Sequence, residues 1–385
     1  MAAERTQLEA GDLVAGESLP LDVYTRTGVL LLARGQVVLT ERQLARLLEE
    51  GIWGEAETVA RLREERGGDA AQTADWRKVS VFHELETLRN DLGALFGSGN
   101  DAGLPGGLAD CAMRLRRAVS LDVDAAIASI QWLRTSPYAI RQSVNVAVLS
   151  EVLLGDLEVP DDVRTATAAA ALAMNLSIVE VQEALFFRQA MTPEEKSQIA
   201  RHPQAAVDRL TAAGVDDTLL LQAVLEHHEA HDGTGYPRKL AGDAIGLPAR
   251  VISVADKFCA TVSERAYRAA VPCSIALRKL LTDAGPTMDT QVAARLARAV
   301  GIYPPGTVVR LKNGETAMAV KRTLDPQAPV VRLVRSRDGV LTSTYSKRLT
   351  SKLAFAVTEE AGRSALPEGF DALQLWNPAL ERGED

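Results

Sequence analysis

The stretch HHEAHDGTGYP, residues 227–237, holds three of the five histidines in this chain of 385 residues. Imidazole is the commonest metal ligand in proteins. Adjacent side chains at the end of a helix project about 100° apart, so His227 and His228 could both face one cavity wall. The pair therefore indicates either a metal site or a polar helix cap, and His231 is interpreted as an incidental neighbour.

The residues after the histidines predict a tight loop. Asp232, Gly233 and Gly235 are residue types that end a helix and permit a sharp turn. The loop would then present Tyr236 and Pro237 in a rigid conformation.

A zinc-protease motif is excluded by its spacing. His227 and His231 are four residues apart, but the protease pattern requires His-Glu-x-x-His. Here His228, Glu229 and His231 give a spacing that is one residue too short.

Asp256 lies within the apolar segment GLPARVISVADKFCATV, residues 246–262, which has the pattern of a buried helix. An unpaired carboxylate in such surroundings costs several kcal/mol. Asp256 therefore needs a cation, which would be either a metal shared with His227 and His228 or a buried arginine.

The periodicity of the chain predicts a mainly α protein in five parts. Residues 1–60 are expected to form a small N-terminal α+β unit, with a turn at Thr27-Gly28 and a helix from about 40 to 51. Residues 61–119 are expected to be a charged helical linker with an exposed loop near 97–107. Residues 120–302 have the Ala- and Leu-rich pattern of a helical bundle.

The last two parts have a different pattern. Residues 303–360 alternate apolar and polar side chains around two hairpin signals, Asn313-Gly314 and Asp338-Gly339, which predicts a β module. Residues 361–385 are predicted to be a polar, partly ordered tail.

Composition and charge restrict the class of protein. No window has the roughly 18 apolar residues of a membrane span, and the N-terminus lacks a secretory pattern, so a cytoplasmic protein is predicted. Cys111, Cys259 and Cys273 lie in apolar surroundings and are predicted to be reduced thiols. The net charge of −8 argues against nucleic acid as a partner. Residues 301–352 nevertheless carry ten Lys or Arg against three acidic residues, which makes the β module basic.

The segment HHEAHDGTGYPRKLAGDAIGLPARVISVADKFCATVSERAYR, residues 227–268, resembles the signature region of the HD-GYP family. These proteins are bacterial phosphodiesterases that linearise and hydrolyse cyclic di-GMP, within the HD metal-dependent phosphohydrolases. The similarity extends through TPEEKSQIARHP, residues 192–203, and YAIRQSVNVAVLSEVLLG, residues 138–155. It covers roughly residues 120–302, and the N-terminal unit is similar to a small domain often fused ahead of HD-GYP domains.

The resemblance implies a helical bundle of the HD type with a site of two or more metals, usually iron or manganese. The positions that match metal ligands of the family are His202, His227, His228 and Asp256. Arg265 and Arg268 match residues that grip the phosphates of the nucleotide, and Tyr236 would lie near the ligand and near a surface that meets partner proteins.

This sequence departs from the family pattern at four positions. Met174 and Asn175 stand where the family has its defining His-Asp pair, Ile178 stands at the family's lysine, and Gln142 replaces an earlier ligand histidine. A neutral amide cannot bridge two metals, and a thioether or an amide oxygen is a weak ligand. The two-metal mechanism is therefore expected to fail, leaving one divalent ion (Fe, Mn or Zn) or none.

Three functions follow from these residues. The leading hypothesis is a degenerate HD-GYP domain that binds cyclic di-GMP, a related nucleotide, or a signalling protein such as a diguanylate cyclase. The alternative is an active metal-dependent phosphodiesterase with a remodelled site, in which Glu180, Glu183 or Glu226 could replace a lost ligand. The third is a structural scaffold, with the histidines as helix caps. A homodimer is compatible with each of them.

Overall fold

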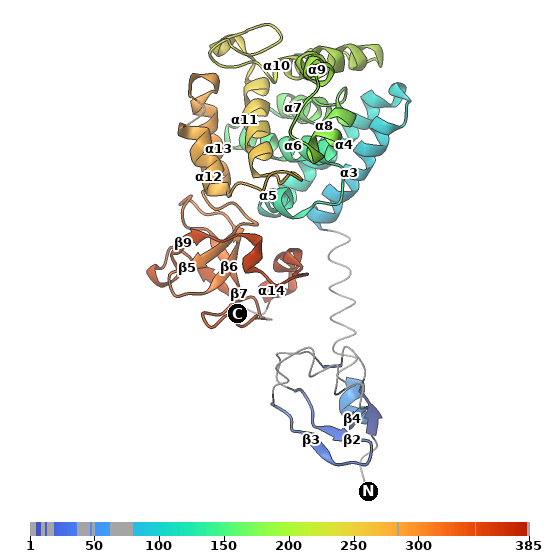
Figure 1. Ribbon diagram of the computed structural model, residues 1–385, viewed down its shortest axis with the longest axis vertical. Coiled ribbons are helices and arrows are strands. Elements are labelled where there is room, and N and C mark those ends of the chain that lie inside the picture. The colour runs from blue at the N-terminus through green and yellow to red at the C-terminus, as the bar shows by residue number, and fades with distance from the viewer. Residues whose placement is uncertain are drawn as a thin grey trace. The chain divides into compact units, whose positions relative to one another are not determined.

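The computed structural model describes residues 5–8, 12–13, 19–36, 47, 51–61, 80–282, 285–342 and 344–382. The chain divides into two compact units, Met1–Arg77 and Lys78–Asp385 (Figure 1). The second unit contains both the helical bundle and the β module, so the bundle and the module belong to one body.

The first unit contains a small antiparallel sheet in the strand order β1-β4-β2-β3. The strands are β1 (Arg5–Gln7), β2 (Val23–Thr25), β3 (Leu30–Leu32) and β4 (Ile52–Glu55). The predicted turn at Thr27-Gly28 joins β2 to β3, and Gly28 has a φ of +89° that favours glycine. Leucine side chains, Val23 and Ile52 form its core. The predicted helix at 40–51 lies mostly outside the described residues.

The bundle of the second unit is built from helices in the order of the chain. Their bounds are α3 (Val81–Gly97), α4 (Leu104–Leu121), α5 (Val123–Trp132), α6 (Tyr138–Asp156), α7 (Asp161–Ala173), α8 (Val179–Phe187), α9 (Pro193–Ala212), α10 (Thr218–Glu226), α11 (Leu247–Val262), α12 (Cys273–Thr282) and α13 (Thr290–Val300). The predicted mainly α fold is confirmed.

Helix α6 is the centre of the bundle, because it packs against α3, α4, α5, α7, α8, α11 and α13. Its residues are buried on every face from Tyr138 to Leu154, apart from Arg141. A helix that is apolar all round is stable only when other helices surround it. The polar residues Gln142, Asn145 and Glu151 on this helix are therefore forced into the interior.

The bundle starts earlier in the chain than the sequence indicated. The segment 61–119 was predicted to be a linker, but α3 and α4 pack against each other and against α6. Arg89 on α3 is buried, and its guanidinium donates to the carbonyl of Leu133 at 3.0 Å and to Oδ1 of Asn145 at 2.8 Å. The predicted loop at 97–107 is a short break, because α4 already begins at Leu104.

The β module is an antiparallel sheet in the order β8-β7-β6-β5-β9. Its strands are β5 (Val308–Leu311), β6 (Thr316–Lys321), β7 (Val330–Arg335), β8 (Lys347–Leu349) and β9 (Val357–Glu360). The predicted turns at Asn313-Gly314 and Asp338-Gly339 follow β5 and β7, and both glycines have positive φ.

The segment after residue 360 differs from the predicted polar tail. Leu366, Ala372 and Leu375 are buried in the core of the β module together with residues of β5, β6 and β7. Trp376 lies edge-to-face against Phe82 of α3, with ring centroids 5.5 Å apart. The segment therefore completes the module and contacts the bundle.

Hydrogen bonds fix the β module to the bundle, and Figure 1 shows the module against the ends of α5 and α12. Trp132 at the end of α5 donates from Nε1 to the carbonyl of Gly306 at 2.9 Å. Arg322 bonds Oδ1 of Asp124 at 2.7 Å. The carboxylate of Glu360 accepts from the backbone of Cys273 at the start of α12 at 2.8 Å. The relative position of bundle and module is thus set by directional contacts.

The composition predicted reduced thiols, and the cysteines in the structure agree with that prediction. Cys111, Cys259 and Cys273, all within the described ranges, are buried and form no disulfide. Among the residues that the structure describes, no helix has the length and apolar character needed to cross a membrane.

We expect Leu375→Ala to lower the free energy of unfolding by about 2–4 kcal/mol, because the substitution leaves a cavity in the core of the module. Leu375 is 1% exposed. The matched control is Leu353→Ala, since Leu353 is 73% exposed and its truncation should change little. Denaturant unfolding measures both. Equal effects of the two substitutions would contradict the placement of the tail in the core.

Candidate metal centre and ligand site

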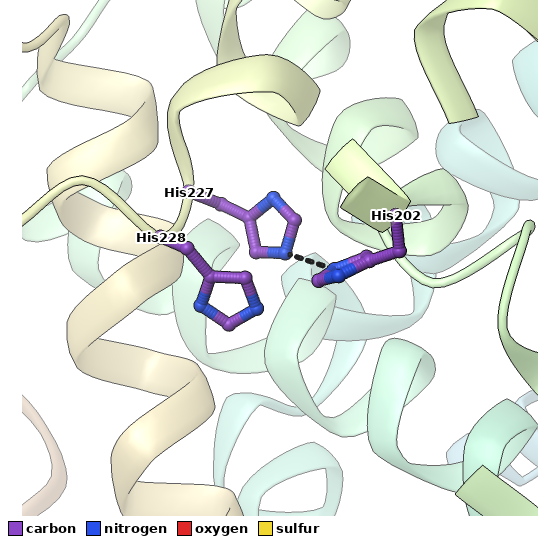
Figure 2. Close-up of side chains that lie close together, drawn as sticks. All are labelled: His202, His227 and His228. Atoms are coloured by element: carbon purple, nitrogen blue, oxygen red, sulfur yellow. Dashed lines mark hydrogen bonds between the residues drawn. The ribbon is translucent and has the colours of Figure 1, made fainter. Parts of the chain in front are cut away.

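Three histidines from two neighbouring helices point toward one another (Figure 2). His202 lies on α9, which begins with a capping box formed by Thr192 and Glu195. His227 is the C-cap residue of α10, and His228 follows it as the chain leaves the helix. The end of α10 therefore presents two imidazoles to the face of α9 that carries the third.

Hydrogen bonds determine which ring nitrogens are free. Nδ1 of His202 lies 2.6 Å from the carbonyl of Ile199, and Nδ1 of His227 lies 2.6 Å from the carbonyl of Val224. A carbonyl only accepts, so both Nδ1 atoms carry protons. The two Nε2 atoms, 3.1 Å apart, then direct lone pairs at each other. This arrangement is stable only with a shared cation, either a proton or a metal ion.

Burial keeps the three imidazoles neutral. It lowers the pKa of His202 to about 4 and that of His228 to about 3. The pKa of His227 is also held well below its ordinary value, first by burial and then by repulsion from His228 and His202. Because neutral imidazole is the form that binds metals, the cluster is ready to bind a cation at physiological pH.

The donor set fits a divalent metal ion. The ligand nitrogens of His202, His227 and His228 lie within 4.8 Å of one another. Two nitrogens that each lie about 2.0–2.1 Å from a zinc ion can be at most about 4.2 Å apart, and the 3.1 Å between the Nε2 atoms meets this limit. The Nδ1 bonds to carbonyls also match the outer contacts that orient metal-binding histidines.

Asp256, the fourth predicted ligand, is not among the groups brought together in this cluster. Its Oδ1 accepts from Nε2 of Gln142 at 2.8 Å. Burial raises the pKa of the Asp256 carboxyl, while the bond from Gln142 and the charge of Arg265 act in the opposite direction. Gln142, which the resemblance places at a ligand histidine, thus bonds Asp256, which it places at a ligand aspartate.

The other substituted positions lie in the interior. Met174 and Asn175 are buried at the C-terminal end of α7, and Ile178 is the buried N-cap residue of α8. Ile178 and His202 line a cavity of about 840 Å³ between α3, α8 and α9. Ile178 therefore places an apolar side chain in the cavity that His202 also lines.

The loop after the histidines is held in shape by Glu229 and Gly235. The buried carboxylate of Glu229 accepts from the backbone of Arg238 at 2.6 Å and of Leu240 at 3.0 Å. A Cβ on Gly235 would lie 2.1 Å from the backbone nitrogen of Ala230, so no other residue fits. Oδ1 of Asp232 caps the turn by accepting from Thr234.

Tyr236 is the loop residue that reaches the metal cluster. Its ring stacks on His228 with centroids 5.0 Å apart and an interplanar angle of 29°. The Tyr236–Pro237 bond is cis, and Pro237 is exposed. His231 lies outside the cluster and bonds the carbonyl of Thr287 through its backbone. Tyr236 could therefore contact a ligand of the metal.

The two predicted phosphate-binding arginines occupy different surroundings. Arg265 is half-buried, and its guanidinium donates to the hydroxyls of Tyr138 and Tyr267 at 3.0 Å each. Arg268 is exposed and donates to the backbone carbonyl of Ala260 at 2.6 Å. Arg265 is thus oriented by phenols, and Arg268, which lies beyond α11, bonds back to the last turn of that helix.

The structure also reveals one site residue that the sequence did not single out, Tyr138, and it places two glutamates that the sequence offered as replacement ligands. Tyr138 orients Arg265, and its ring lies under that guanidinium at 5.1 Å. Glu183 accepts from the backbone of Ala139 at 2.6 Å, and Glu226 accepts from that of Gly246 at 3.1 Å. These glutamates are therefore engaged in helix contacts, and neither is part of the histidine cluster. Tyr138 precedes Gln142 by one helical turn, which is the signal that could have identified it.

Comparisons with known proteins agree with the site. Residues 129–292 match the family model described as HD domain. A cyclic di-GMP phosphodiesterase of Pseudomonas aeruginosa is 30% identical over 66% of this chain and 59% of its own length. A 3'3'-cGAMP-specific phosphodiesterase of Vibrio cholerae is 31% identical over 44% of this chain and 37% of its own length.

A cyclic di-GMP phosphodiesterase response regulator of Xanthomonas campestris is 33% identical over 43% of each chain. This chain thus spans between about a third and three fifths of the length of these relatives. A solved HD-G-"Y"-P protein of Bdellovibrio bacteriovorus superposes with a TM-score of 0.49 at 18% identity, over 76% of this chain and 98% of its own.

Residues 129–292 of the helical bundle therefore match the HD domain, and the curated relatives that this chain resembles are named as cyclic dinucleotide phosphodiesterases.

We expect Gly235→Ala to destabilise the loop and to weaken metal binding, because a Cβ cannot be placed beside the backbone of Ala230 without moving it. Gly106→Ala in α4 is the matched control, since a Cβ there meets nothing within 4 Å and alanine favours the helix. Thermal unfolding and metal titration of both variants measure the effect. If the Gly235→Ala protein unfolds and binds metal like the wild type, that result would contradict the close approach of Gly235 to the backbone of Ala230.

We expect the chelator-stripped protein to bind one Zn²⁺ ion per chain in calorimetric titration. His227→Ala should weaken this binding at least tenfold, because it removes one of three ligands. His83→Ala is the control, since His83 is exposed on α3, away from the cluster. Two ions per chain, or equal binding by both variants, would contradict a single three-histidine site.

Proposed function

We propose that the chain binds a cyclic dinucleotide, cyclic di-GMP in the first place, through a degenerate HD-GYP site in which hydrolysis is impaired or absent. The bound state, rather than a product, would carry the signal, either directly or by docking a signalling protein such as a diguanylate cyclase. The names of the relatives support the ligand class, and the chemistry of the site supports the loss of turnover.

The observation that carries this proposal is the composition of the metal cluster. It consists of three neutral imidazoles and, among the described residues, includes no carboxylate. Hydrolysis of a phosphodiester needs a group that takes a proton from the attacking water. Asn175 cannot do so, and Asp256 is hydrogen-bonded to Gln142.

Ligand binding survives the loss of these groups. A divalent ion held by His202, His227 and His228 would supply positive charge for a phosphate of the ligand. Arg265, fixed by two tyrosine hydroxyls, offers a guanidinium without a carboxylate partner in the described part of the chain. The ring of Tyr236 would limit the space beside His228.

One observation favours the alternative of an active phosphodiesterase. Three histidines with a remaining open position are also the ligand set of some catalytic zinc sites. A single ion could then support slow hydrolysis if Asp256 is released from Gln142 when the substrate binds. Turnover measurements distinguish this function from binding alone.

We expect purified protein with one metal ion to bind cyclic di-GMP in calorimetry and to leave it intact in a chromatographic hydrolysis assay. Arg265→Gln should weaken binding at least tenfold, because a charge-assisted contact is lost. Arg337→Gln is the control, since Arg337 is exposed in the β module and paired with Asp338. Metal-dependent turnover would establish the alternative, and absence of binding would contradict both functions.

A further inference from the structure

A cavity of about 720 Å³ lies between the bundle and the β module. It is separate from the histidine cluster, because none of the three histidines lines it. The end of α5, the start of α6, the chain between α11 and α12, and residues 360–364 of the module form its walls. Its size is within the range of small-molecule sites, about 300–1,000 Å³.

The walls of this cavity carry more positive than negative charge. Four arginines and two glutamates line it: Arg134, Arg141, Arg265, Arg363, Glu264 and Glu360. Both glutamates are already engaged. Glu264 pairs with Arg134 at 2.5 Å, and Glu360 accepts from the backbone of Cys273 and Ser274 at the start of α12.

Arg363 is held at the cavity wall without a carboxylate partner in the described part of the chain. Its guanidinium stacks over the ring of Trp132 at 4.0 Å, and Nη2 donates to the carbonyl of Gln131. Trp132 is itself fixed by its bond to Gly306. The guanidinium is therefore oriented by neutral groups, while Nη1 and Nε remain available for a ligand.

Arg141, at the start of α6, also lines the cavity without a carboxylate partner in the described part of the chain. Its Nη1 donates to the carbonyls of Arg134 and Ser136 at 3.2 and 3.3 Å. The rings of Tyr138 and Phe186 lie beside its guanidinium at 5.7 and 5.9 Å. No carboxylate within the described ranges pairs with it.

Electrostatics support the need for an anion. Burial, followed by repulsion from Arg134, lowers the pKa of Arg141 and lowers that of Arg363 to about 10, and the charge of Glu264 offsets only part of this. Two half-buried guanidinium groups that are both repelled by a third are stabilised when an anion enters between them.

We propose that this cavity is a second ligand site, which binds a small organic phosphate between Arg141 and Arg363 at the seam of the bundle and the β module. The planar forks of guanidinium groups match phosphate oxygens, and a diphosphate can span two of them. The faces of Trp132 and Phe186 provide apolar surface for the organic part of the ligand. The proposal uses neither the metal nor the three histidines, although Arg265, which lines this cavity, also belongs to the proposed cyclic dinucleotide site, so the two sites adjoin.

The probe is inorganic pyrophosphate, titrated calorimetrically into the full chain in the presence of EDTA, so that no metal at the histidine cluster can bind it. We expect one pyrophosphate per chain. Arg363→Gln and Arg141→Gln should each weaken binding at least tenfold, and Arg337→Gln should not change it.

Ala270→Glu tests the site without replacing any of its arginines. Ala270 is exposed and lines the cavity, so the fold tolerates a glutamate there. Its carboxylate would place a negative charge at the entrance of the cavity. It should abolish binding, whereas Ala270→Gln, of the same size, should weaken it less. Failure of the wild type to bind pyrophosphate, unchanged binding by Arg363→Gln and Ala270→Glu, or equal affinity for malonate would each overturn the proposal.

Discussion

The site depends on two imidazole nitrogens that face each other and need a shared cation. Because the Nδ1 atoms of His202 and His227 are bonded to carbonyls of their own helices, each neutral Nε2 presents a lone pair, and the two are 3.1 Å apart. The fold holds α9 and α10 close enough to impose this contact, and burial lowers the pKa of both imidazoles, which favours a metal ion over a proton. A metal ion removes the repulsion, so the cluster gains stability when it binds one.

The proposal that hydrolysis is impaired rests on Gln142, Met174 and Asn175. Gln142 bonds Asp256, and Asn175 and Met174 are packed in the interior at the end of α7. All three are neutral side chains buried in the bundle. Arg265 is oriented by Tyr138, and Tyr236 is stacked on His228, which supports the proposal that the site binds an anionic ligand. In the proposed function, binding and hydrolysis are therefore separable.

The sequence predicted the helical bundle and the hairpin turns of the β module, because periodicity and turn residues act locally. The grouping of His202 with His227 and His228 was implied only by the family resemblance. The sequence did not predict the bond between Gln142 and Asp256, which are 114 residues apart. The tail looked polar because Leu366 and Leu375 are too sparse to make a periodic pattern, although both reach the core. The sequence showed that the β module is basic. It could not show the ion pairs of the module, such as Arg348 with Glu315, because these residues meet only in the folded chain.

The central claim is that this site holds one ion between three histidines. The most direct measurement is anomalous diffraction at the zinc or manganese edge from crystals of the protein purified without a metal-affinity tag. The account predicts one peak within bonding distance of Nε2 of His202 and Nε2 of His227. Two peaks about 3.5–4 Å apart, the separation in two-metal hydrolases, or no peak at the histidines would contradict it.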